Sequence, residues 1–348
     1  MLKIGLETES LHLFFQNKKI DMFGFVELAN ELGVDGVQIN IVKDYNLDEK
    51  WGALGSNSEK YLTELKSLID KYNMFVEIDM RDLDYERMEE VIEVANRLGA
   101  DTIRSYIPVV PVIKNINSGS EGAYDFAKVR GEFNMDSYQV GYEKVIKLIP
   151  LLEKNRIKLA LENHEYETSD ELVELIKRIN SPWVGFLFDF GNSMMVWEEP
   201  VRAAENMAPY TYSTHFKDHI IIPEPNDEYG YVVCGVPAGK GNIDLKSVFN
   251  IMMKKSPLTR INVEMCYPYC AQFKRKPGTG GVFEVGKGAF KIEKPIYEYD
   301  VIKPLEYYYP QEISNELLEK MLIDQMSGVK ESLSYLKKLR EEYYVLGQ

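Results

Sequence analysis

The sequence lacks several features, and each shortage excludes a class of protein. It has no run of about 18 apolar residues, so it predicts no membrane-spanning helix and no membrane partner. Residues 1–5 lead directly into a strand pattern and do not resemble a signal peptide. The three cysteines, Cys234, Cys266 and Cys270, form neither a disulfide framework nor a zinc ribbon, which indicates a reducing, cytoplasmic location.

Positive charge is also in deficit. The chain has 41 Lys and Arg residues against 55 Asp and Glu residues, and its formal net charge is -14. Such a chain repels a phosphate backbone, so duplex nucleic acid is not an expected partner.

What is present is a chain of 348 residues, 45% of them hydrophobic, in which strand patterns alternate with amphipathic helical patterns. Its length allows one barrel with insertions or two smaller units. Strands are expected at 2–7, 34–40, 74–80, 101–106, 157–162 and 184–189, and two more end at His215 and Glu264. Helices are expected at 21–32, 58–72, 85–98, 137–155, 169–179, 201–207, 245–254 and 315–344.

This alternation predicts an α/β fold, a (β/α)8 TIM barrel that forms a single domain over residues 1–348. Long loop insertions are expected after strands 4, 7 and 8, at residues 108–134, 220–242 and 267–310. The last insertion follows a strand end on the ligand-binding face. It is therefore expected to act as a lid over the pocket or as a subunit interface.

Four polar residues stand at or near the carboxyl ends of different predicted strands. They are Glu162, Asp189, His215 and Glu264. Parallel sheets bind ligands at this edge, so the four side chains are expected to converge. One nitrogen and three oxygen donors suit a divalent cation such as Mn, Mg, Co or Zn. The alternative is four unrelated polar residues that share one barrel face.

The order of these motifs resembles the xylose isomerase-like barrel superfamily, the sugar phosphate isomerase/epimerase group that includes ketose 3-epimerases, inosose dehydratase and endonuclease IV. The resemblance rests on residues 31–37, Leu161-Glu162-Asn163, Phe188-Asp189-Phe190-Gly191-Asn192, residues 214–218, residues 239–244 and Val263-Glu264. It implies that Glu162, Asp189, His215 and Glu264 are metal ligands and that Mn²⁺ is the expected ion.

Two positions depart from the epimerases of this group. Those enzymes have a histidine three residues after the aspartate, where this chain has Asn192, and this chain adds His164 two residues after Glu162. These departures resemble the larger, catalytic subunit of bacterial C-glycoside deglycosidases, a resemblance that rests on the Glu162-Asn163-His164 step and on the long tyrosine-rich insertion at 267–310. That resemblance implies elimination from 3-oxo-glucosides and a small β subunit as a partner.

All reactions implied by the resemblance begin with removal of a proton next to a carbonyl, with a metal ion stabilising the enolate. His164 is the candidate base, with an orienting role near the metal as its alternative. In the epimerases, the equivalents of Glu162 and Glu264 move the protons instead, so both glutamates are also catalytic candidates.

Six further residues are candidates for binding substrate. They are Arg104, Asn192, Lys217, Tyr106, Glu7 and His12. Arg104 and Lys217 could instead form barrel-end salt bridges, Glu7 could cap the first helix, and His12 could be packed in the core.

The leading hypothesis is a metal-dependent lyase that acts on an oxidised glycoside, within an oligomer that includes a small β subunit. The enzyme alternative is a ketose 3-epimerase, sugar isomerase or inosose dehydratase. A non-catalytic sugar-binding barrel would have lost metal ligands, and none is missing. Endonuclease IV-like repair needs a histidine-rich trinuclear site, whereas this chain has four histidines.

The cluster Tyr307-Tyr308-Tyr309 suits an interface or packs back onto the barrel.

Overall fold

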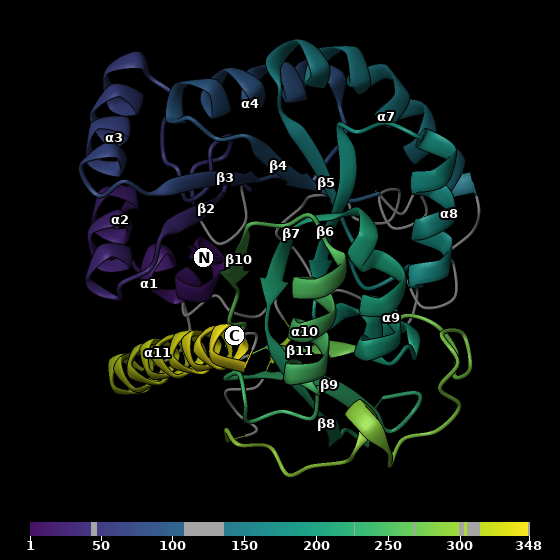
Figure 1. Cartoon of the computed structure of the whole chain (residues 1–348). Coiled ribbons are helices and arrows are strands. Elements are labelled where there is room, and N and C mark those ends of the chain that lie inside the picture. Colours follow the sequence, from purple (N-terminus) through teal and green to yellow (C-terminus); the bar gives the residue numbers. More distant parts are fainter. Residues whose placement is uncertain are drawn as a thin grey trace.

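Eight parallel strands close into a barrel at the centre of the molecule (Figure 1). The computed structural model describes residues 1–42, 47–107, 136–225, 227–267, 269–298, 303–304 and 314–346. The strand order is β1-β10-β7-β6-β5-β4-β3-β2. The strands are β1 (Lys3–Glu7), β2 (Gly36–Asn40), β3 (Phe75–Asp79), β4 (Thr102–Ser105), β5 (Lys158–Glu162), β6 (Val184–Asp189), β7 (Thr211–Phe216) and β10 (Arg260–Val263). The predicted (β/α)8 barrel is therefore confirmed.

Helices surround the barrel in alternation with its strands (Figure 1). They are α1 (His12–Gln16), α2 (Met22–Glu31), α3 (Glu59–Lys71), α4 (Tyr85–Leu98), α7 (Asp136–Asn155), α8 (Ser169–Ile179), α9 (Pro200–Met207), α10 (Leu245–Lys255) and α11 (Asn315–Leu346). Local sequence sets their ends. Thr168 and Glu171 form a capping box at the start of α8, and α4 ends at Gly99, whose φ of 77° suits glycine. None of the described helices is long and apolar enough to cross a membrane.

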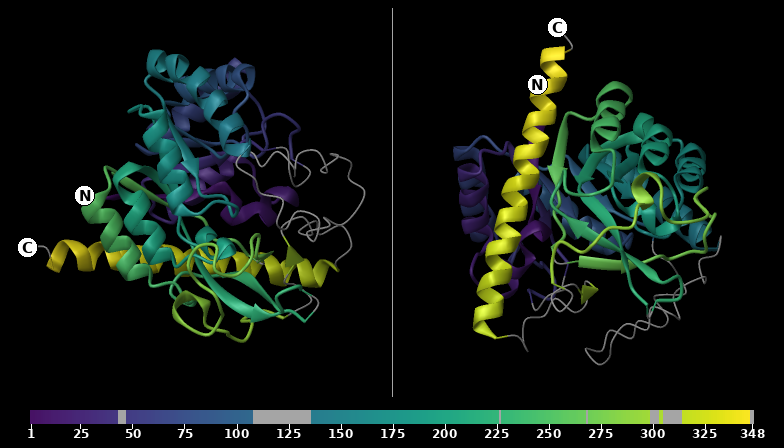
Figure 2. Two further views of the ribbon diagram at one scale, coloured as in Figure 1. Left: turned by 90° about the vertical axis from the view of Figure 1, so that its right-hand side faces the viewer. Right: turned by 90° about the horizontal axis from the view of Figure 1, so that it is seen from below.

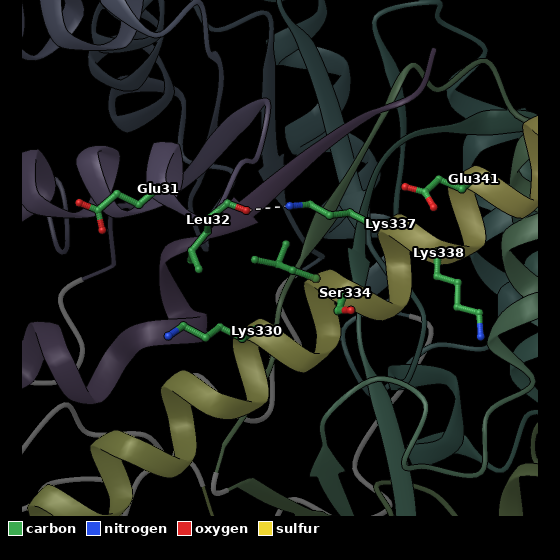
Figure 3. Close-up of a pocket in the computed structure, with 8 residues that line it drawn as sticks. Glu31, Leu32, Lys330, Ser334, Lys337, Lys338 and Glu341 are labelled. Atoms are coloured by element: carbon green, nitrogen blue, oxygen red, sulfur yellow. Dashed lines mark hydrogen bonds between the residues drawn. The ribbon is translucent and has the colours of Figure 1, made fainter.

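The last helix, α11, runs along one side of the molecule as a long rod (Figure 2). Its Tyr344 hydroxyl accepts a hydrogen bond of 2.8 Å from the backbone N–H of Leu2 at the start of the chain. The ammonium group of Lys337 donates a hydrogen bond of 2.7 Å to the carbonyl of Leu32, at the end of α2 (Figure 3). Helix α11 therefore closes the ring of helices beside β1.

A second sheet lies outside the barrel and was not predicted. It contains β8 (Asp218–Pro223), β9 (Tyr231–Val236), β11 (Tyr269–Gln272) and β12 (Lys303–Pro304), in the order β12-β11-β9-β8. The insertions after the seventh and eighth barrel strands were expected as loops, but they contain these strands. The predicted insertion at 108–134 lies outside the described residues, as does the cluster Tyr307-Tyr308-Tyr309.

The described part of the excursion after β10 packs on its own barrel. The ring of Phe273 stacks on Trp197 at a centroid distance of 4.1 Å, and the indole of Trp197 donates a 2.9 Å hydrogen bond to the carbonyl of Arg275. The buried Lys274 forms a 3.0 Å ion pair with Glu165, which follows β5. The excursion thus covers the loops that follow β5 and β6.

Candidate metal centre

The four polar residues predicted at the strand ends converge inside the barrel. All four side chains are buried, and Nδ1 of His215 lies at the centre of the group. The distances from this nitrogen are 3.4 Å to Oε1 of Glu162, 3.6 Å to Oδ2 of Asp189 and 3.4 Å to Oε1 of Glu264. One imidazole nitrogen thus faces three carboxylates that come from three other strand ends.

Backbone contacts hold Asp189 in place. Its Oδ1 atom accepts hydrogen bonds from the N–H groups of Gly191 at 2.8 Å and Asn192 at 2.9 Å. The side chain of Asn163 binds the backbone N–H and carbonyl of Asp189 at 2.8 and 3.0 Å, which ties the ends of β5 and β6 together. Asn163 had no predicted role, although it belongs to the Leu161-Glu162-Asn163 motif. These contacts leave Oδ2 of Asp189 directed at His215.

A hydrogen-bond chain through Gln38 determines which nitrogen of His215 carries a proton. The amide nitrogen of Gln38 donates to Oε2 of Glu77 at 2.8 Å, so its Oε1 atom is the acceptor for Nε2–H of His215, at 2.6 Å. Within the described residues, Nδ1 of His215 has no hydrogen-bond partner. Because three carboxylates face this nitrogen, it requires either a second proton or a metal ion.

The pKa of His215 also indicates that Nδ1 carries a second proton or binds a metal ion. Burial lowers its pKa, but the charge of Glu264 and a contact with Asp189 outweigh burial, so the pKa is raised overall. A positive charge is therefore stabilised at Nδ1. Oxygen atoms of Glu162 and Asp189 and a nitrogen of His215 all lie within 4.8 Å of one another. The donor set fits a divalent ion with mixed nitrogen and oxygen preference.

Replacing Gln38 with leucine is expected to weaken Zn²⁺ binding by about 10- to 100-fold, because the imidazole loses the acceptor that fixes its tautomer. Titration of metal-free protein with Zn²⁺ by calorimetry measures this change. The matched control is Gln38→Glu, which retains an oxygen acceptor for Nε2–H and is expected to bind Zn²⁺ more tightly than Gln38→Leu. Equal affinity in all three proteins would show that Gln38 does not orient His215.

Two buried cations contact the carboxylates. Arg104 lies between Oδ1 of Asp79, at 2.6 Å, and Oε2 of Glu162. Lys217 lies 2.7 Å from Oδ2 of Asp189 and also contacts Oε2 of Glu264. Burial lowers the pKa of Lys217, but the negative charge of Asp189 raises it by a larger amount. The net pKa therefore lies well above its usual value. Both residues were predicted to bind substrate or form barrel-end salt bridges, and these contacts are salt bridges.

His164 lies beside this centre with a half-buried side chain. Its ring stacks on Tyr106 with a centroid distance of 4.2 Å and an angle of 10° between the planes. Burial and the positive charge of Arg104 lower its pKa to about 3. The imidazole is therefore neutral at neutral pH. Asn192, the other departure noted in the sequence, donates a 3.0 Å hydrogen bond to Oε1 of Glu162.

Two of the predicted substrate-binding residues have structural partners. Glu7 caps the turn that follows β1, because its carboxylate accepts hydrogen bonds from the hydroxyl of Thr8 at 3.0 Å and the N–H of Glu9. Nδ1 of the buried His12 lies 3.0 Å from the carbonyl of Glu9 and 3.2 Å from the amide nitrogen of Gln325. The capping and packing alternatives fit these contacts.

Asp218 explains the glycine-rich motif at 239–244. Its carboxylate accepts hydrogen bonds from the N–H groups of Gly239 at 2.9 Å, Gly241 at 2.8 Å and Ile243 at 3.3 Å. A Cβ atom at Gly241 would lie 2.1 Å from Oδ1 of Asp218, so the backbone approaches too closely for a side chain. The motif therefore fixes the loop that leads into α10.

Gln38 and Asp79 also contact the residues of the centre, but neither was predicted as a site residue from the sequence. Both stand at or near the carboxyl ends of barrel strands, β2 and β3. The rule that identified Glu162 and Asp189 applies equally to these two strands, so that signal was present in the sequence.

Comparison with known proteins identifies a protein family that matches this chain. A family model described as a xylose isomerase-like TIM barrel matches residues 26–279. YihM, an uncharacterized protein of Escherichia coli K12, is 26% identical over 247 residues, which cover 71% of this chain and 67% of YihM.

Two solved structures show the similarity of fold. The structure of an L-ribulose 3-epimerase has a TM-score of 0.57 and 11% identity, and the match covers 100% of this chain and 99% of that chain. A xylose isomerase-like TIM barrel protein from Mycobacterium smegmatis in complex with magnesium has a TM-score of 0.54 and 18% identity, with 76% of this chain and 90% of that chain covered.

Proposed function

This chain belongs to the xylose isomerase-like TIM barrel family, and from this premise we propose that it is a divalent-metal-dependent enzyme that removes a proton next to a sugar carbonyl. In the more specific form of the proposal, the substrate is a 3-oxo-glucoside, and the aglycone leaves by β-elimination as in C-glycoside deglycosidases. The observation that carries the proposal is the position of His164, two residues after Glu162 and stacked on Tyr106, beside a buried group of three carboxylates and His215.

Glu162, Asp189, His215 and Glu264 would hold the metal ion. When bound, a divalent ion supplies electrostatic stabilisation of the negative charge that develops on the carbonyl oxygen. Mn²⁺ is the proposed ion, with Mg²⁺, Co²⁺ and Zn²⁺ as alternatives, because one imidazole and three carboxylates accept both hard and borderline cations. The protein from Mycobacterium smegmatis with the same fold is in complex with magnesium, which supports a divalent ion here.

His164 is the proposed base. It stands two residues after Glu162, and the stack on Tyr106 holds its ring in one orientation. In the proposed reaction, the imidazole takes the proton from C2, and the electron pair of that C–H bond forms a double bond between C1 and C2. The bond from C1 to the aglycone breaks, and the aglycone leaves with the electron pair of that bond and takes a proton from water.

The contacts of the two glutamates favour this one-base elimination over epimerisation. Oε2 of Glu162 is paired with Arg104, and Oε2 of Glu264 is paired with Lys217. The Oε1 atom of each glutamate faces His215. Burial raises the pKa of Glu264, but the charges of His215 and Lys217 lower it by a larger amount, so its net pKa lies below its usual value. Epimerisation would require one glutamate to remove a proton from one face of the sugar and the other to supply a proton on the opposite face, and it is the second candidate function because both glutamates are present.

The test is product analysis with Mn²⁺-loaded protein in D₂O, with a 3-oxo-C-glucoside and a panel of ketoses as substrates. Release of the aglycone, detected by chromatography, supports the elimination. His164→Ala is expected to lower the release rate by at least about 100-fold, because general base catalysis contributes about 10²–10⁴-fold. The metal content of the variant serves as the control and is expected to equal that of the unaltered protein.

Two other outcomes would redirect the proposal. Epimerised ketose without release of aglycone would assign the proton transfers to Glu162 and Glu264. Absence of deuterium exchange and of product from every substrate would overturn the enzymatic proposal.

The elimination proposal includes a small β subunit, because the C-glycoside deglycosidases that this chain resembles have one. The chain is expected to form a hetero-oligomer with such a subunit. Light scattering of the co-expressed proteins measures the assembly, and aglycone release by the chain alone would show that the subunit is dispensable.

A further inference from the structure

The second sheet places two cysteines directly opposite each other on neighbouring strands. Cys234 on β9 pairs with Cys270 on β11 in antiparallel register (Figure 1), and the structure holds both as thiols. Opposed residues of a sheet point to the same face. The packing agrees with this geometry, because Cys270 and Tyr297 both pack against the small apolar cluster that contains Cys234. The two thiols are therefore neighbours on one face of the sheet.

The backbone hydrogen bonds show which kind of pair the cysteines form. The carbonyl of Ile221, on the edge strand β8, accepts a 2.8 Å hydrogen bond from Glu293, on the side away from β9. Backbone groups of successive residues in a strand point to opposite sides, so those of Ile220 point at Cys234, its partner on β9. Cys234 thus directs its own backbone groups at β8. Cys234 and Cys270 are consequently a non-hydrogen-bonded pair.

This kind of pair brings two cysteines within disulfide range. In a non-hydrogen-bonded pair the Cα atoms lie about 4.5 Å apart, and the side chains are closer than in the other kind of pair. A disulfide needs Cα atoms about 4.4–6.8 Å apart, so Cys234 and Cys270 can bond without a change of strand pairing. Cys266 is directed elsewhere, because its Sγ lies 3.6 Å from Nζ of Lys217 and 3.7 Å from Oε2 of Glu264.

The two thiols differ in their access to a reagent. Cys234 is fully buried, whereas Cys270 is half-buried. Burial raises the pKa of the Cys234 thiol, and the neighbouring Cys270 raises it further. Since the thiolate is the form that reacts, Cys270 should react first and Cys234 second.

We propose that Cys234 and Cys270 are a redox site that forms a reversible disulfide with a small disulfide, such as oxidised glutathione, as the oxidant. The Cys270 thiolate attacks one sulfur of the oxidant, whose S–S bond breaks, and a first glutathione leaves. The Cys234 thiolate then attacks the Cys270 sulfur and expels a second glutathione. Two protein thiols are oxidised, one small disulfide is reduced, and the two protons of the protein thiols end on the two glutathione molecules.

The bond would join two segments that cover the barrel mouth. Strand β9 belongs to the insertion after β7, and β11 belongs to the excursion after β10. The excursion already contacts the loop after β5, where the hydroxyl of Tyr269 donates a hydrogen bond to Glu165. Oxidation would therefore hold the excursion against the barrel, whereas a reducing compartment would keep the two thiols apart. The inference does not depend on the metal centre or on the proposed function.

The test incubates the full chain with oxidised glutathione, unfolds it, alkylates the remaining thiols and identifies the peptides by mass spectrometry. The alkylatable thiols are expected to fall from three to one per chain, with Cys234 linked to Cys270 and Cys266 alkylated. Dithiothreitol is expected to restore all three. Hydrogen–deuterium exchange is expected to be slower in β11 of the oxidised protein than in the reduced protein.

Two variants separate the steps. Cys234→Ala is expected to stop at a mixed disulfide between Cys270 and glutathione, because the second thiol is gone. Cys266→Ala is the matched control and is expected to form the internal bond. Circular dichroism checks that each variant folds.

Three results with the unaltered protein would each overturn the inference, and none of them requires a variant. They are three thiols that stay alkylatable, a glutathione adduct on Cys270 that persists without an internal bond, and a disulfide that contains Cys266 or joins two chains.

Discussion

His215→Ala is expected to lose Zn²⁺ binding at the candidate metal centre and to lower the rate of deuterium exchange next to the carbonyl by more than about 100-fold. Groups that only orient a metal ligand contribute about 10- to 100-fold to affinity or activity, so removal of the ligand itself should cost more. His215 is the only nitrogen donor of the four candidate ligands, and its Nδ1 faces all three carboxylates. Without it, those carboxylates would repel one another in a buried site.

Zn²⁺ is the appropriate probe for this variant because a borderline cation favours the imidazole donor that the substitution removes. Elemental analysis after dialysis gives the Zn²⁺ content, and nuclear magnetic resonance follows deuterium exchange of the substrate. Circular dichroism serves as the control that the barrel still folds. A His215→Ala protein that binds one Zn²⁺ with unchanged affinity would contradict the assignment of His215 as a ligand.

Glu77→Ala is expected to lower the free energy of unfolding by about 3–5 kcal/mol, the usual cost of removing one partner of a buried ion pair. Glu77 is fully buried on β3 and forms an ion pair with Arg260. Its carboxylate also accepts hydrogen bonds from Ser213 at 2.5 Å, Asn262 at 2.8 Å and Gln38 at 2.8 Å. Its removal leaves these groups without their shared acceptor in the barrel interior.

Denaturant unfolding followed by circular dichroism measures this loss. Asp101→Ala is the matched control, because Asp101 is the exposed partner of the same Arg260 and its side chain is 63% exposed. A solvent-exposed ion pair contributes less than about 1 kcal/mol, so the control is expected to unfold near the unaltered protein. Equal destabilisation by the two substitutions would refute the role given to the buried network.

Glu77→Ala should also weaken Zn²⁺ binding, because Glu77 orients Gln38 and Gln38 orients His215. This effect links the stability of the barrel interior to the metal centre. The two predictions therefore concern opposite ends of one hydrogen-bond chain that runs from β3 through β2 to β7.

Much of the barrel could be predicted from the sequence because its signals are local. The apolar runs that end at Glu162 and Asp189 are strands, and the amphipathic stretch between them is the helix α8. The periodicity of hydrophobic residues and the helix-capping residues indicate each strand or helix from a short stretch of sequence. Placing the ligand candidates on one face followed from the geometry of parallel strands alone.

The second sheet could not be predicted in the same way. The apolar run in β9 is visible in the sequence, but its partners are β8, before it, and β11, more than thirty residues after it. Pairing across such a distance depends on where the excursion docks, and Trp197, Phe273 and Phe290 determine that by stacking on one another. The spacing of hydrophobic residues along the chain does not predict these contacts between distant segments.

The sequence by itself determined the kind of fold, the order of its elements and the types of donor available for a metal ion. Only the tertiary structure decided which nitrogen of His215 faces the carboxylates, that Arg104 and Lys217 neutralise part of their charge, and that Glu7 and Glu9 lie against Glu264. The physical reason is barrel closure. Strand and helix patterns arise from neighbours along the chain, whereas β1 and β10, at opposite ends of the sequence order, meet only when the sheet closes on itself.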